Sequence, residues 1–149
     1  MPPPPIAAYD PSRVIQTFGT ITPVAYGPGT RLSITPTGPN FSVMQGQDGH
    51  VIRVKTRAIH HNLNFELMKS DPANDLLQEL YAKDVDSLTP AGIVKYTLTD
   101  NNGTTKASAA YAWIAQVPDV TYSAGGDLYI WNVTLISAEV QPRAMTFIP

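Results

Sequence analysis

Two adjacent histidines and several nearby carboxylates are the residues whose types and spacing could do chemistry. His60 and His61 precede Glu66, and Asp71 and Asp75 follow shortly after. Imidazole and carboxylate groups are the usual protein ligands of metal ions and the usual general acids and bases. Whether they form a site depends on the secondary structure that positions them.

Residues 58–68 alternate in a way that predicts a long, half-buried strand. One face has Ile59, His61, Leu63, Phe65 and Leu67, and the other has Ala58, His60, Asn62, Asn64, Glu66 and Met68. Successive side chains of a strand point to opposite faces, so His60 and His61 cannot hold one ion. Neither has a ligand two positions away. We therefore expect no metal site, with His60 at the surface and His61 half-buried.

No other pattern predicts catalysis. The sequence places no second carboxylate beside Glu66, and it lacks the GxSxG, GxGxxG and Walker patterns. With no cysteine in the chain, thiolate chemistry, iron–sulfur clusters and disulfides are excluded. We expect no catalytic residues, no cofactor and no enzyme activity.

Asp71 and Asp75 have a structural explanation in a helix predicted over about 72–83. Ser70 or Asp71 is a suitable N-cap, Pro72 suits the first turn, and Asp75 lies near the positive end of the helix dipole. Three leucines at helical spacing predict the face that packs on the rest of the fold: Leu76, Leu77 and Leu80.

The rest of the chain predicts strands and turns. "FSVM" and "HVIRVK" flank the glycine-containing loop 45–49, which is typical of a hairpin. Later strands, such as "SAAYAWIAQV" and "DLYIWNVTLISAEV", are apolar on both faces, so we expect both faces to be covered. The predicted fold is mainly β, an antiparallel β-sandwich or barrel with one packed α-helix. Residues 1–12 are interpreted as a proline-rich N-terminal arm and residues 13–149 as a single domain.

Composition limits the classes of partner. The net charge is -2 and only 15% of residues are charged, below the roughly 25% of an average protein. A nucleic-acid binder that relies on a basic surface is therefore disfavoured, and an assembly subunit, whose surface is covered by neighbours, is favoured. No apolar segment approaches the ~20 residues needed to span a bilayer, and we expect a soluble, unexported chain.

The segment "MQGQDGHVIRVKTRAIHHNLNFELMKSDPANDLLQEL" resembles tail tube proteins of contractile-tailed bacteriophages. A Gly-x-Asp-Gly hairpin is followed by a Val-x-Arg strand, then by an amphipathic strand ending in Leu-Met and a helix start "SDPANDLL" at 70–77. "AYAWIAQVPDVTY" at 110–122 is similar to a later block of the family. The resemblance covers roughly Tyr9 to Gln141 in the same order.

The resemblance implies two sheets closed against one helix, in hexameric rings that stack into a hollow tube. It implies a virion protein, assembled in the host bacterial cytoplasm, that conducts phage DNA during ejection. The implied partners are other copies of the chain, the tail sheath protein, baseplate and tail terminator proteins, and a tape measure protein in the lumen. No membrane is implied.

Two sets of residues are candidates for these contacts. The polar face of the strand 58–68 is the candidate lumen wall: His60, Asn62, Asn64 and Glu66. The hairpin loop is the candidate contact between rings, together with the arm 2–12: Gln45, Gly46, Gln47, Asp48 and Gly49.

Two alternatives remain open. One is the tube of a phage-tail-like particle or of a type VI secretion system, with the same fold. The other is a ligand-binding β-sandwich that uses the aromatic side chains as a stacking platform, although their strand periodicity favours a role in core or interface packing. Six residues are candidates for that platform: Tyr96, Tyr111, Trp113, Tyr122, Tyr129 and Trp131.

Overall fold

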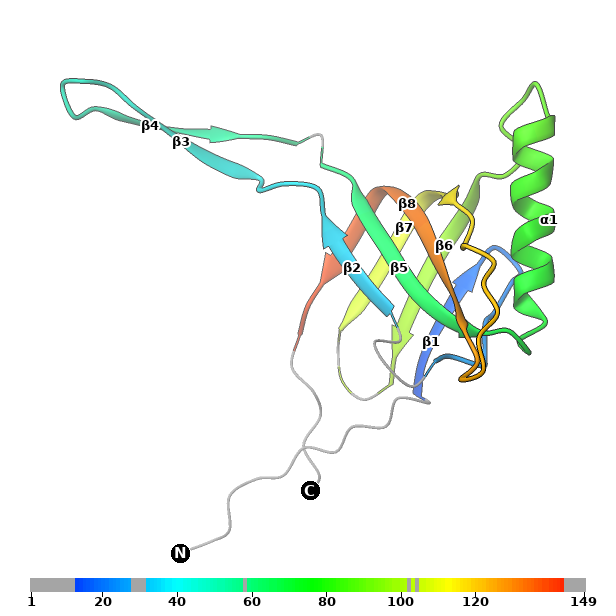
Figure 1. Cartoon of the computed structure of the whole chain (residues 1–149). Coiled ribbons are helices and arrows are strands. Elements are labelled where there is room, and N and C mark those ends of the chain that lie inside the picture. The colour runs from blue at the N-terminus through cyan, green and yellow to red at the C-terminus, as the bar shows by residue number, and fades with distance from the viewer. Residues whose placement is uncertain (1–12, 28–31, 58, 102, 104, 144–149) are drawn as a thin grey trace, which may run out of the picture.

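The computed structural model describes residues 13–27, 32–57, 59–101, 103 and 105–143 (Figure 1). The predicted arm 1–12 lies outside these residues, as does Ala58. Within the described part, no helix has the length and apolar character required to cross a membrane.

One antiparallel sheet of six strands forms the body of the molecule. Its spatial order is β1-β6-β7-β8-β5-β2, so β1 and β2 are its two edges. The strands are β1 (Val14–Phe18), β2 (Leu32–Pro36), β5 (His61–Met68), β6 (Val94–Asp100), β7 (Lys106–Gln116) and β8 (Leu128–Gln141). The sheet curls into a half-barrel, with the long strands β7 and β8 at its centre (Figure 1). Irregularities in pairing, between Val94 and Tyr96 and between Ile114 and Gln116, interrupt the register of β7 with its neighbours.

The core lies on one face of this curled sheet. In β5 and β8 alternate residues are buried, which agrees with the predicted period of two: Leu63, Phe65, Leu67, Trp131, Val133 and Leu135. The Phe18 ring lies 5.3 Å from that of Phe65 and 5.0 Å from that of Tyr96, measured between centroids. The Tyr96 hydroxyl donates a hydrogen bond of 3.1 Å to Oε1 of the buried Gln16. Burial is the main cause that raises the pKa of Tyr96, so this phenol stays a neutral donor.

The predicted helix is present as α1 (Ala73–Asp86), a little longer than expected. Leu77 is fully buried and Leu80 packs against the core. Leu76 does not match the expected packing face, because its side chain is 47% exposed. Ala73 and Leu77 are four residues apart and lie on the buried side of the helix. Leu76 directly precedes Leu77, so its side chain is rotated by about 100° around the helix axis and points away from the core.

A second, two-stranded sheet stands apart from the body. β3 (Phe41–Gln45) and β4 (Val51–Lys55) form the predicted hairpin, which extends away from the half-barrel (Figure 1). All ten of its strand residues are exposed. The class predicted from the sequence, mainly β and antiparallel with one helix, is confirmed. The body is one curled sheet.

Two buried polar side chains join the helix to three other segments. Asp71 is not a simple N-cap: one carboxylate oxygen accepts from the amides of Val24 and Ala25, at 2.9 and 2.8 Å, and the other accepts from the amide of Ala73 at 2.9 Å. The N-cap position itself is occupied by Pro72.

Asn74 completes this connection. Its side-chain amide donates to the carbonyl of Met68 at 2.9 Å and to that of Asp71 at 3.1 Å. Its oxygen accepts from the indole N–H of Trp131 at 3.0 Å. The start of α1 is thereby bonded to the loop 22–27, to the end of β5 and to β8.

Replacing Asn74 by alanine is expected to lower the free energy of unfolding by about 1–3 kcal/mol, because the buried indole N–H of Trp131 loses its acceptor. The matched control is Asp75→Ala at the neighbouring, exposed position, where only a helix-dipole contribution of a few tenths to about 1 kcal/mol is lost. Urea unfolding of both variants measures the difference. Equal losses would contradict the role assigned to Asn74.

Candidate assembly surfaces

The polar face of β5 continues across its neighbours as an uncharged surface. Asn62 and Asn64 are exposed on β5, and directly paired residues of an antiparallel sheet point to the same side. Asn62 pairs with Thr35 and Thr134, and Asn64 pairs with Ser33 and Asn132. We call these six hydroxyl and amide residues the polar sheet face: Ser33, Thr35, Asn62, Asn64, Asn132 and Thr134.

The other two candidate lumen residues lie at opposite ends of this face. His60 is exposed just before β5, and its carbonyl accepts from the amide and the hydroxyl of Thr37, each at 3.0 Å. Glu66 is half-buried beside Gly27. A Cβ at Gly27 would lie 2.6 Å from a Leu128 methyl and 3.3 Å from a Glu66 oxygen, so a larger residue there would displace the Leu128 side chain. Asn62, Asn64 and Glu66 alternate along β5 and so share one side of the sheet, and Glu66 is the least accessible of the four candidates.

The two adjacent histidines differ in their surroundings, since His60 is exposed and His61 is half-buried. The Nδ1 of His61 is buried without a hydrogen-bond partner. Burial lowers the pKa of His61, and the adjacent His60 lowers it further. Among the described residues, no group of three or more histidine, aspartate or glutamate side chains could hold a metal ion.

Four of the six aromatic side chains considered for a stacking platform make other contacts, whereas Tyr111 is exposed and Trp113 half-buried on β7. Tyr96 and Trp131 are buried in the core. Tyr122 and Tyr129 are engaged by Lys69, whose Nζ lies 4.0 and 5.4 Å from their ring centroids. The same Nζ donates to the carbonyl of Thr121. These contacts fix the 117–127 segment against the end of β5.

The hairpin loop 45–49 is a compact turn at the far end of β3 and β4. Gly46 donates its amide to the carbonyl of His50 at 2.9 Å, and Gly49 adopts a φ of +88°, which disfavours other residues. Asp48 and His50 pair at 2.5 Å between Oδ2 and Nδ1. This hydrogen bond, with the one from the backbone amide of His50, lowers the pKa of Asp48. All five loop residues are exposed.

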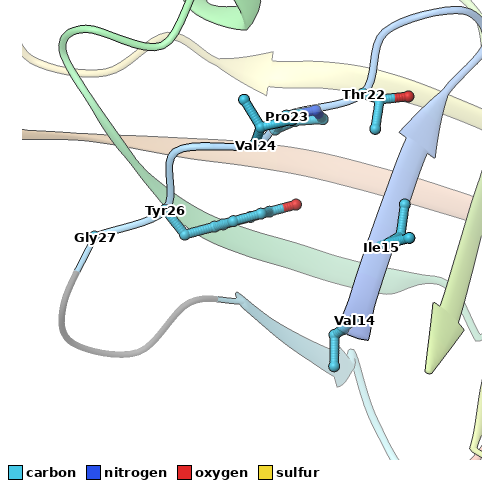
Figure 2. Close-up of a pocket in the computed structure, with 7 residues that line it drawn as sticks. All are labelled: Val14, Ile15, Thr22, Pro23, Val24, Tyr26 and Gly27. Carbon is cyan, nitrogen blue, oxygen red and sulfur yellow. The ribbon is translucent and has the colours of Figure 1, made fainter. Parts of the chain in front are cut away.

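An apolar pocket of about 480 Å³ lies between β1 and the loop 22–27 (Figure 2). Its apolar walls come from both segments: Val14, Ile15, Pro23, Val24 and Tyr26. The pocket could not be predicted from the sequence, because residues far away in the chain hold the loop in place beside β1. Asp71 holds the amides of Val24 and Ala25, and Tyr26 forms a β-bridge with Leu67.

No family model matches the sequence, and no curated protein gives a significant match. Several solved structures share the fold, and three of them belong to contractile assemblies. A chain of an extracellular contractile injection system, the PVC sheath-tube complex in its extended state, is 11% identical with a TM-score of 0.56, and the match covers 95% of this chain and 93% of that one.

The anti-feeding prophage cap, described as a tube terminating cap, is 16% identical with a TM-score of 0.55, over 93% of this chain and 95% of that one. The sheath/tube terminator of the PVC system is 13% identical with a TM-score of 0.55, over 92% and 99%. Nearly the whole chain therefore has the fold of proteins found in contractile tube assemblies, as the resemblance in the sequence predicted.

The lowered pKa of His61 predicts a pH dependence of stability. In the unfolded chain His61 binds a proton near its ordinary pKa of 6.5, whereas in the folded chain it binds one only at lower pH. Stability should therefore fall as the pH falls through this region. His61→Gln should remove part of the decline between pH 7.5 and 5.5, measured by urea unfolding, whereas His60→Gln at the exposed neighbour should retain it. The same decline in both variants would rule out His61 as the cause.

Proposed function

We propose that this chain is the structural subunit of a hollow tube in a contractile particle, the tail of a bacteriophage or a phage-tail-like injection system. The observation that supports this most strongly is the shared fold over more than nine-tenths of the chain with components of sheath-tube, tube-cap and terminator assemblies. Hexameric rings of the chain stack along one axis. The role is mechanical, with no catalytic step and no cofactor.

The polar sheet face, with His60 and Glu66 at its ends, lines the lumen. Its amide and hydroxyl groups remain hydrated, and they offer no cations to hold phosphates. In a phage, double-stranded DNA passes along this wall during ejection, and a tape measure protein occupies the lumen before that. The chemistry of the face supports the assignment, because a wall for transit must be wetted without strong binding.

The loop Gln45 to Gly49, at the end of the hairpin, contacts the next ring. Its exposure and its distance from the half-barrel support this role (Figure 1). On the outside, the chain meets a sheath protein, and at the two ends of the tube it meets baseplate and terminator proteins. The particle carries the chain in its tail, and assembly takes place in the bacterial cytoplasm.

Electron microscopy of the purified, concentrated protein tests the proposal. Negatively stained samples should contain rings or tubes of uniform diameter, and sedimentation should show that the assembled fraction rises with concentration. A strict monomer at every concentration, both alone and mixed with a preformed baseplate as nucleus, would contradict it.

The lumen assignment has a separate test, because the chain has no cysteine. In tubes, Asn64→Cys should react with a small maleimide but resist a maleimide coupled to a large polymer, which cannot enter. The control is Glu79→Cys on the exposed side of α1, which should react with both reagents. In unassembled protein both positions should react with both reagents. Full reaction of position 64 with the large reagent in tubes would exclude it from the lumen.

A further inference from the structure

The register of the hairpin gives it two unlike faces. Residues directly opposite one another lie on the same side, and the sides alternate along each strand. Ser42 pairs with Val54, and Met44 pairs with Ile52. These four form the apolar hairpin face: Ser42, Met44, Ile52 and Val54.

The opposite side, the mixed hairpin face, combines apolar and charged residues. Phe41 pairs with Lys55, Val43 with Arg53, and Gln45 with Val51. The Arg53 guanidinium lies 4.6 Å from the centroid of the Phe41 ring. Both cations of the two strands are therefore on this side, and they keep it compatible with water.

The apolar hairpin face is uncovered in the single chain. Met44, Ile52 and Val54 are 58%, 56% and 40% exposed. An isolated two-stranded hairpin is marginally stable in water. A contiguous apolar patch on such an element is typical of a surface that another protein covers.

The described walls of the pocket beside β1 are mostly apolar, and they lie at the other end of the body from the hairpin. The hairpin connects to the sheet where Pro36 pairs with His61, at the start of β5. The pocket wall joins β5 at its end, through the β-bridge between Tyr26 and Leu67. At ~3.4 Å per residue, these points are roughly 20 Å apart along β5, and the hairpin extends away from the body (Figure 1).

A hairpin therefore cannot reach the pocket of its own chain, but it can reach the pocket of another copy. A contact between different surfaces of one molecule is heterologous and repeats from copy to copy, closing into a ring or continuing as a filament according to the rotation between copies. Ile15 and Val24 at the pocket mouth are 44% and 71% exposed, so an entering aliphatic side chain meets apolar partners.

We propose that the apolar hairpin face of one copy docks into the β1 pocket of the next copy, with Met44 and Ile52 as the inserted side chains. This deepens the proposed function and rests on it: the hairpin strands, in addition to the loop 45–49, bind the neighbouring subunit. The mixed hairpin face, with Arg53 and Lys55, points away from the pocket.

Cysteine crosslinking between copies tests the docking. One chain carries Ile52→Cys and another carries Val24→Cys; the mixed sample is assembled and then oxidised. The matched control replaces Ile52→Cys by Val51→Cys, because Val51 is the adjacent residue, has nearly the same exposure (59%) and lies on the mixed face. A disulfide requires Cα atoms about 4.4–6.8 Å apart. We expect at least about ten-fold more crosslinked dimer from position 52 than from position 51.

A second pair of variants measures the same contact through assembly. Ile52→Asp should raise the protein concentration needed for assembly at least about ten-fold, whereas Val51→Asp should change it little. Circular dichroism should show the same folded body in both, since both positions are exposed in the single chain. Equal effects of the two substitutions would overturn the proposal.

The outcomes separate this inference from the proposed function. Tubes in which position 52 crosslinks no better than position 51 would overturn the docking but leave the proposed tube function standing. The same result is expected if residues 1–12 of the same chain fill the pocket. A preferred crosslink at position 52 in chains that never form rings or tubes would support the docking and contradict the tube. Absence of both the assembly and the crosslink would overturn both.

Discussion

The arrangement of the whole molecule depends on two buried polar side chains at the start of α1. Asp71 accepts three backbone amides and Asn74 bonds to Met68 and Trp131, so four segments have one mutually consistent arrangement. Buried polar groups without partners are costly, which disfavours other placements of the loop 22–27. That loop is a wall of the β1 pocket. The network therefore also fixes where the pocket lies relative to the hairpin at the far end of β5.

The elements with strong local signals were predictable from the sequence. β5 alternates between apolar and polar residues, and the structure buries Leu63, Phe65 and Leu67 as the period requires. The turn at Gly46 and Gly49 defines the hairpin, and the leucine spacing defines the helix. Each of these signals arises within a few residues of chain. Steric limits on the backbone and the direction of the side chains are enough to predict such local structure.

What depends on distant contacts could not be predicted in this way. Asp71 was predicted to cap the helix because an aspartate just before Pro72 suits that position. In the structure, two of the three backbone amides that donate to its carboxylate belong to residues 24 and 25. Leu76 was placed on the packing face because its type fits, but the direction of burial is set by where the sheet lies. Likewise, β3 and β4 have the sequence of ordinary sheet strands, and only the tertiary structure separates them from the six-stranded sheet.

The distribution of charge gives the surfaces of the chain different physical roles. Hydroxyl and amide groups form the polar sheet face, and these groups can readily exchange hydrogen bonds with water. The six residues of this face carry no charge that would hold a moving polyanion. Two cations lie instead on the mixed hairpin face, away from β5. Strong, specific contact needs apolar surface that becomes fully covered, and the apolar hairpin face and the described walls of the β1 pocket provide such surface without a charged side chain. In the proposed tube, cohesion between subunits and passage through the lumen therefore use surfaces of different chemistry, which meet where Glu66 lies beside Gly27 of the pocket wall.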